Sequence, residues 1–204
     1  MTAATPPSQR LRPSTRRKRP WHWPLALAIA AGLAAPCIVS WAPPASKAVE
    51  LKGSTYFLRP PSDVSLISYD TNVFVPRPDD YFTLQIPTDA GASLGGLTIQ
   101  QIRGSDRQFL LAMNRIHAFL GRPRAEGTPV PVEVRFEAAS LRFSLSFPQP
   151  VPPGSTLTVV LQPWQNPNQA DTYLFEVQAY PAGPNPVAAP LGVGSLSIYS
   201  SFGR

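Results

Sequence analysis

The sequence predicts an all-β protein: a single immunoglobulin-like antiparallel β-sandwich of about seven to nine strands behind an N-terminal signal or anchor segment. Short stretches of residues 49–204 alternate apolar and polar side chains, which is the pattern of strands with one buried face. Eighteen of the 26 prolines lie in the same region, mostly between those stretches. Because proline interrupts helices and central strands, this distribution favours short strands joined by turns.

The alternation is clearest at 141–147, where four apolar side chains from Leu141 to Phe147 are separated by arginine and serine. Residues 107–120 fit either one helical stripe or two short strands, and the neighbouring β segments favour the second interpretation. Strand character also extends over 55–58, 64–69, 71–75, 81–86, 97–102, 132–136, 157–161, 174–180 and 196–199.

The beginning of the chain has the order of a secretory signal. A basic run at 10–19 precedes an apolar stretch at 24–41, and Ser46 and Ala48 are small residues at the expected spacing. We therefore predict a signal peptide over 1–48. The alternative is an uncleaved signal anchor, because the apolar stretch has about the length that spans a bilayer. Both interpretations place the protein in the periplasm or cell envelope. If the segment is uncleaved, residues 24–41 anchor the protein to the inner membrane, and this segment is its only contact with the membrane.

After the signal we expect a short lead-in at 49–61 and one domain at 62–204. The chain carries a net charge of +6, but seven of its 18 basic residues and none of its 12 acidic residues lie in 1–48. Residues 49–204 therefore hold 11 basic and 12 acidic side chains, a net charge of −1. A near-neutral domain lacks the basic surface that nucleic acids require, so we predict no nucleic-acid partner.

Few residues could support catalysis or metal binding. The only cysteine, Cys37, lies in the apolar stretch, and the only histidine after residue 48 is His117, four residues beyond Met113. This composition excludes a Cys/His metal cluster in the domain and disfavours a periplasmic metal carrier. Ser195 lacks the spacing of a hydrolase nucleophile. We predict no metal and no cofactor.

An enzyme that cleaves envelope glycan through two carboxylates is a second disfavoured alternative. Such chemistry needs two facing acids about 5–10 Å apart. Nothing in the sequence brings two of the available acids together, and Asp79 and Asp80 also suit a simple turn. The available acids are Asp79, Asp80, Glu133, Glu137, Asp171 and Glu176.

Two features suggest binding, and the first is basic. The segment 103–124 holds five arginines and one acid, Asp106. If these arginines gathered at one end of the domain, they would attract an anionic polymer or a lipid headgroup. If they were spread over loops, they would be ordinary solvated side chains. The candidate binding residues of this segment are Arg103, Arg107, Arg122 and Arg124.

The second feature combines aromatic side chains and amides. Trp164, Asn166, Asn168 and Tyr173 occupy and follow a loop between two predicted strands, an arrangement typical of sugar-binding sites. In the alternative interpretation, Trp164 caps the core of the sandwich and the asparagines form the turn.

Five stretches carry a family resemblance: 81–87, 90–101, 147–156, 173–175 and 179–186. Together they resemble an exported family of cyanobacterial proteins that is known only as a domain of unknown function. The resemblance extends over roughly residues 60–200. It implies a cyanobacterial cell-envelope protein and supplies no activity, cofactor or catalytic residue.

The function predicted from these observations is that of an exported, non-enzymatic cell-envelope protein. It would act as a binding or structural module for a wall polysaccharide or a protein partner. The glycan-cleaving enzyme and the metal carrier are the alternatives.

Overall fold

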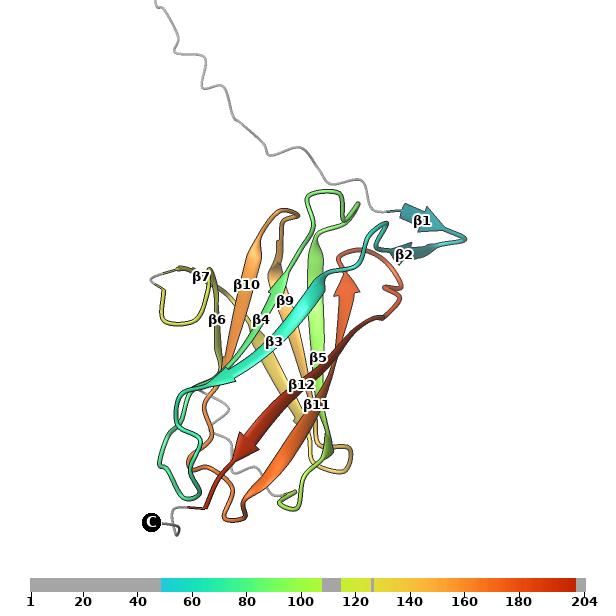
Figure 1. Cartoon of the computed structure of the whole chain (residues 1–204). Coiled ribbons are helices and arrows are strands. Elements are labelled where there is room, and N and C mark those ends of the chain that lie inside the picture. The colour runs from blue at the N-terminus through green and yellow to red at the C-terminus, as the bar shows by residue number, and fades with distance from the viewer. Residues whose placement is uncertain (1–48, 108–114, 126, 201–204) are drawn as a thin grey trace, which may run out of the picture. The chain divides into compact units, whose positions relative to one another are not determined.

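Two five-stranded antiparallel sheets pack face to face into a β-sandwich (Figure 1). The computed structural model describes residues 49–107, 115–125 and 127–200. Within them the chain forms twelve strands, which is more than the predicted number. The immunoglobulin-like antiparallel sandwich that the sequence predicts is confirmed. The predicted signal or anchor, 1–48 with its apolar part 24–41, lies outside the described residues.

The strands divide into two sheets and a separate hairpin. In spatial order, the first sheet contains β3 (Ser62–Ser68), β4 (Asp80–Gln85), β10 (Thr156–Leu161), β6 (His117–Leu120) and β7 (Thr128–Val130). The second sheet contains β12 (Ala189–Ile198), β11 (Asp171–Pro181), β5 (Leu94–Arg103), β9 (Arg142–Val151) and β8 (Glu133–Glu137). The hairpin consists of β1 (Val49–Leu51) and β2 (Ser54–Tyr56).

The strand predictions were least accurate for strands that carry few apolar side chains. β1 and β7 have three residues each, and β7 contains Pro129, which its position at the edge of a sheet tolerates. β12 begins at Ala189, whereas the predicted strand begins at 196. The prediction missed the first part of β12 because Gly192 and Gly194 interrupt the alternation of apolar and polar side chains. The predicted strand at 71–75 is wrong, since this segment belongs to the loop between β3 and β4.

β9 is also longer than predicted, because it continues through two prolines to Val151. Its pairing with β5 shifts register here: Leu94 pairs with Val151, whereas Gly96 pairs with Ser146. The proline-containing stretch therefore forms an irregularity in the ladder, beyond which Val151, the last residue of β9, pairs with Leu94.

The apolar faces of the two sheets form the core. In β9 the side chains of Phe143, Leu145 and Phe147 are buried between exposed neighbours, as the alternation predicts. Phe82 of β4 meets Phe175 of β11 edge to face across the sandwich, with ring centroids 5.6 Å apart. Burial of each such side chain contributes roughly 1.5–3 kcal/mol, so this packing holds the two sheets together.

Part of the ambiguous segment 107–120 is a strand, because β6 covers its last four residues. Residues 108–114 lie outside the described residues. Where the structure describes the chain, no helix is long and apolar enough to cross a bilayer.

The β1–β2 hairpin is attached to the sandwich by a buried threonine. Oγ1 of Thr55 donates to the carbonyl oxygen of Pro184 at 2.7 Å, and the backbone oxygen of Thr55 accepts from the N–H of Val187 at 3.0 Å. The Thr55 side chain lies directly over Gly183, whose φ is +148°. Figure 1 shows this hairpin at the opposite end of the sandwich from the loop that joins β3 to β4.

A methyl group at position 183 should loosen the hairpin. An alanine Cβ there would lie 2.5 Å from Oγ1 and 2.9 Å from Cγ2 of Thr55. We expect Gly183→Ala to lower the free energy of unfolding by roughly 1–3 kcal/mol, because the contact and the positive φ are both unfavourable. Urea titration measures the stability, and hydrogen exchange at Val187 reports whether the hairpin detaches.

Gly53→Ala is the matched control. Gly53 also has a positive φ, +77°, but a Cβ there would meet nothing within 4 Å. This variant should lose about 1 kcal/mol and leave exchange at Val187 unchanged. Equal exchange in the two variants would contradict the anchoring role of Thr55.

Candidate binding surface

Loops from both sheets meet at the end of the sandwich where β3 ends and β4 begins, the lower end of Figure 1. Tyr199, directly after β12, donates its backbone N–H to the carbonyl oxygen of Thr71 at 2.7 Å. The carbonyl oxygen of Tyr199 accepts from the N–H of Val73 at 2.9 Å. These two bonds fasten the β3–β4 loop (69–79) to the last strand of the second sheet.

The β10–β11 loop (162–170) lies against the β3–β4 loop. The N–H of Arg77 donates to the carbonyl oxygen of Trp164 at 2.9 Å, and the N–H of Asn166 donates to the carbonyl oxygen of Val75 at 2.8 Å. A third bond runs from the N–H of Phe74 to the carbonyl oxygen of Pro167 at 3.4 Å. Because backbone bonds join the two loops at three points, their side chains keep a fixed spacing.

Asn166 reinforces this connection from below. Its side chain is 2% exposed, and Nδ2 donates to the carbonyl oxygens of Asp70 at 2.5 Å and Asn72 at 2.9 Å. A buried amide that donates to two carbonyl groups of one loop is costly to remove, since both acceptors would lose a hydrogen bond. Asn166 is therefore a structural support for the surface above it.

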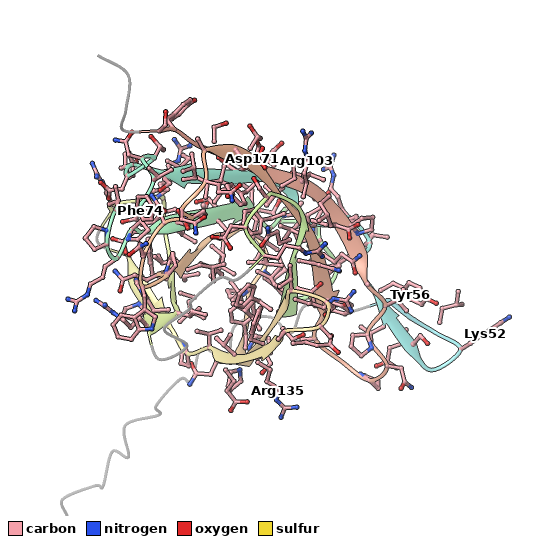
Figure 2. The ribbon with its side chains drawn as sticks, turned by 90° about the horizontal axis from the view of Figure 1, so that it is seen from below. Lys52, Tyr56, Phe74, Arg103, Arg135 and Asp171 are labelled. Atoms are coloured by element: carbon pink, nitrogen blue, oxygen red, sulfur yellow. The ribbon has the colours of Figure 1, made fainter. Side chains whose placement is uncertain are left out.

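Four aromatic side chains on these segments remain exposed. Tyr69 is 46% exposed, Phe74 54%, Trp164 50% and Tyr199 59%. We call these four residues the aromatic end. Aromatic side chains release much free energy when they are buried, so a set left exposed on connected loops indicates a surface for a partner. Figure 2, which views the molecule from below, shows Phe74 at the rim of this end.

Phe74 is the unusual member of the set. Its φ is +61°, in the left-handed region that side chains other than glycine, asparagine and aspartate rarely adopt. This conformation costs about 1–2 kcal/mol, and the half-exposed ring recovers only part of the free energy that full burial would give. A strained residue that presents an aromatic ring to solvent is typical of a functional position.

Tyr69, one of the four residues of the aromatic end, contacts the cation of Arg124. The guanidinium carbon of Arg124 lies 3.5 Å from the centroid of the Tyr69 ring, and Tyr69 also meets Tyr81 edge to face at 5.8 Å. The cation–π contact holds the turn between β6 and β7 against the first sheet. It also places a positive charge beside Tyr69.

The structure divides the four residues that the sequence proposed for sugar binding. Trp164 does not cap the core, because half of it is exposed, and Asn168 is exposed on the same loop. Asn166 is buried as a support. Tyr173 is completely buried, and its hydroxyl donates to the carbonyl oxygen of Gln169 at 3.0 Å. The ring of Tyr173 therefore belongs to the core, and a role of this residue in ligand binding stays a prediction.

The four candidate arginines lie in two places. Arg103 ends β5 of the second sheet and Arg107 lies in the segment that follows it, whereas Arg122 and Arg124 belong to the turn between β6 and β7 of the first sheet. Arg124 is engaged with an aromatic ring, and Arg103 lies beside Asp171 (Figure 2). A role of these arginines in binding an anionic polymer stays a prediction.

A hollow of about 510 Å³ opens beside Tyr199. It is lined by residues 170–172 at the beginning of β11 and by residues 197–200 at the end of β12. These segments pair as neighbouring antiparallel strands, so the walls of the hollow are fixed by the sheet.

Asp171 supplies the charge of this hollow. Its Oδ2 accepts from the N–H and the hydroxyl of Ser105, at 2.8 and 2.5 Å, and its Oδ1 accepts from the N–H of Thr172 at 2.7 Å. The hydroxyl of Ser105, the two N–H groups and the charge of Arg103 lower the pKa of Asp171. The carboxylate is therefore ionised near neutral pH.

A second carboxyl group is buried beneath the β3–β4 loop. Asp80, at the start of β4, is 4% exposed and stands opposite Ser68 at the end of β3. Burial raises the pKa of Asp80 to about 7, the hydrogen bond from Ser68 lowers it, and the charges of Asp79 and Asp70 raise it. Three aspartates therefore surround the base of this loop.

The structure places two residues that the alternative chemistries would use, Asp80 and His117. Asp80 lies beneath the surface, so it has no access to a glycosidic oxygen. Among the residues that the structure describes, no group of three or more His, Cys, Asp and Glu side chains could hold a metal ion. His117 stacks on Phe119 with centroids 6.4 Å apart, and Met113 lies outside the described residues.

Residues 54–198 match the family described as a protein of unknown function, DUF2808. The chain belongs to this family. The resemblance to a domain of unknown function is thereby confirmed, whereas cyanobacterial origin and an envelope role stay predictions. The matched DUF2808 region extends from the start of β2 to the end of β12, so it includes both loops of the aromatic end.

A comparison with curated proteins finds no match. Among solved structures, the DUF2808 chain is similar to BslA, a bacterial hydrophobin, with 13% identity, a TM-score of 0.45 and coverage of 72% of this chain and 98% of BslA. An uncharacterised protein from Nocardia farcinica with an immunoglobulin-like fold gives 12% identity, a TM-score of 0.41 and coverage of 66% and 96%. A collagen-binding domain from a Staphylococcus aureus adhesin gives 8% identity and a TM-score of 0.36, with coverage of 67% of this chain and 94% of that domain. These values carry no information on function.

The buried carboxyl of Asp80 predicts that stability depends on pH. Its pKa is raised from 3.8 to about 7 on folding, so the folded state binds this proton more tightly. The stabilisation that this bound proton gives the folded state is therefore complete below about pH 4, declines between about pH 4 and pH 7, and is lost above about pH 7. We expect Asp80→Asn to remove this decline and to raise the free energy of unfolding by roughly 1–3 kcal/mol in alkaline buffer.

Urea titrations over a series of pH values measure the effect. The control is Asp63→Asn, because Asp63 is an exposed aspartate on β3. Its profile should follow that of the unmodified protein. If Asp80→Asn kept the same decline between pH 4 and 7, the buried carboxyl would not be its source.

Proposed function

We propose that this DUF2808 protein is an exported, non-enzymatic binding module of the cell envelope that docks on a wall polysaccharide through its aromatic end. The observation that carries the proposal is the exposure of Phe74 in a strained backbone conformation, on a loop bonded to the one that presents Trp164. Export is supported by the basic run and apolar stretch of residues 1–48.

The aromatic end is suited to binding because its loops are already fixed. Backbone hydrogen bonds join the two loops to each other and the β3–β4 loop to Tyr199, and the side chain of Asn166 bonds to two carbonyl groups of the β3–β4 loop. A partner would therefore lose little of its binding free energy to ordering the protein. Flat aromatic rings have few rotatable bonds and offer an apolar face to the C–H groups of a sugar ring.

The charges at this end favour a polysaccharide of low charge. The charges at this end come from Arg77, Arg103 and Arg124 and from Asp70, Asp79 and Asp171, so neither sign dominates the surface. A strongly anionic polymer would gain little from such a mixed field, whereas an uncharged chain can use the rings and hydrogen bonds directly. A protein partner is the alternative outcome of the test below.

Removal of the rings should weaken binding without unfolding the domain. We expect Trp164→Ala and Phe74→Gly each to lower affinity for isolated cell walls of the source organism by about tenfold. Phe74→Gly should keep the free energy of unfolding within about 1 kcal/mol, because the relief of backbone strain offsets the lost contacts of the ring. Co-sedimentation of the full chain with cell walls, with and without protease treatment of the walls, measures the affinity.

Leu51→Ala is the matched control, since Leu51 is 60% exposed on the hairpin at the opposite end of the sandwich. Its binding should equal that of the unmodified chain. Unchanged pelleting of Trp164→Ala and Phe74→Gly would contradict the proposal. Loss of pelleting after protease treatment of the walls would assign the aromatic end to a protein partner instead.

A further inference from the structure

The hollow beside Tyr199 has the chemistry of a sugar-binding subsite. It combines a 59% exposed aromatic side chain, an ionised carboxylate and the hydroxyl groups of Thr172, Ser197 and Ser200. Its volume, about 510 Å³, lies within the range of roughly 300–1,000 Å³ that is usual for ligand sites. Because paired strands form its walls, the hollow exists before any ligand arrives.

We propose that this hollow holds one neutral pyranose unit, with the sugar ring against Tyr199 and sugar hydroxyls bonded to Asp171 and to the hydroxyls of the hollow. This inference rests on the proposed function, since Tyr199 belongs to the aromatic end, and it names the part of the polysaccharide that the site selects.

Within residues 49–107, 115–125 and 127–200, the hydrogen bonds of Asp171 leave one acceptor position for a ligand. A carboxylate offers about four acceptor positions. Ser105 occupies two of them on Oδ2, and the N–H of Thr172 occupies one on Oδ1. The remaining position on Oδ1 can accept a sugar hydroxyl. Because three bonds already fix the carboxylate, that bond costs little side-chain entropy.

The hydroxyls of the hollow complement a row of sugar hydroxyls. Oγ1 of Thr172 and Oγ of Ser197 lie 3.4 Å apart on neighbouring strands. Each hydroxyl both donates and accepts, so the pair can serve adjacent hydroxyl groups of one pyranose whichever way their protons point. The aromatic ring beside them takes the apolar face of the same sugar.

A peptide strand fits this place less well. Peptides commonly bind a sheet by adding a strand to its edge, which needs free backbone groups. At Tyr199 the N–H is bonded to Thr71 and the carbonyl oxygen to Val73. An anionic sugar is also disfavoured, because its charge would lie against the carboxylate of Asp171.

The test is direct titration of the full chain with defined glycans. The neutral probes are cello-oligosaccharides, malto-oligosaccharides and mannan, and the anionic probe is polygalacturonate; isothermal titration calorimetry reports affinity at low and high salt. We expect binding of at least one neutral glycan, with little dependence on salt, and weaker binding of polygalacturonate. Failure of every neutral glycan to bind, or a preference for polygalacturonate, would overturn the proposal.

The variants separate the subsite from the rest of the surface. Tyr199→Ala should weaken neutral-glycan binding about tenfold and Ser197→Ala about threefold, whereas Tyr199→Phe should retain most of it. Tyr56→Ala is the control, because Tyr56 is a 37% exposed tyrosine on the hairpin at the opposite end. The backbone bonds of Tyr199 persist in all its variants, so thermal unfolding should change little. Equal affinity of Tyr199→Ala and the unmodified chain would overturn the subsite.

The two proposals fail in different ways. If Trp164→Ala weakens pelleting with cell walls but Tyr199→Ala leaves glycan binding unchanged, the binding module stands and the subsite is wrong. If Trp164→Ala has no effect while Tyr199→Ala weakens glycan binding, the subsite stands and the wider aromatic end is wrong.

Discussion

The packing of two apolar sheet faces is the interaction on which the rest of this molecule depends. Phe82, Phe143 and Phe175 fill the space between the sheets, and Tyr173 closes it near one end. This core is complete without the aromatic residues of the loops. Trp164 and Phe74 are therefore free to face solvent, and their exposure needs an explanation other than folding.

Buried polar side chains lie beneath the aromatic end, where apolar side chains would generally stabilise the fold more. Asp80 and Asn166 are buried beneath it, and among the described residues an oxygen of each has no hydrogen-bond partner. Such groups are costly in the interior, yet they fix the loops above more rigidly than apolar packing would. Phe74 adds backbone strain at the same end. The concentration of these costs in one place is typical of functional surfaces.

Features set by interactions between neighbouring residues could be predicted from the sequence, whereas features set by contacts between distant segments could not. Period-two alternation identified β9 and β11 because burial of one strand face is recorded locally along the chain. The same rule failed for β12, where glycines and a proline obscure the pattern. The sequence proposed both Trp164 and Tyr173 for one surface site, and the structure exposes half of Trp164 but buries Tyr173. Only its position in the completed core decides that it is buried.

The aromatic end itself could not have been derived in this way. Phe74 and Tyr199 are 125 positions apart in the sequence, and each looks like an ordinary aromatic near a turn. Proline, asparagine and aspartate in residues 70–79 indicated a loop. Nothing in that segment indicated which other segment of the chain the loop would contact. Backbone bonds from Tyr199 to the β3–β4 loop arise only when the second sheet closes over the first.

The sequence by itself determined the fold class, the near-neutral charge of the domain and the scarcity of catalytic and metal-binding side chains. These properties follow from composition and local periodicity, which no folding step alters. The tertiary structure alone decided which aromatic rings face solvent, which asparagine supports the loops, and which carboxylate is buried and which ionised. Those outcomes depend on contacts between distant segments, because burial and hydrogen bonding are set by what the fold places beside each residue.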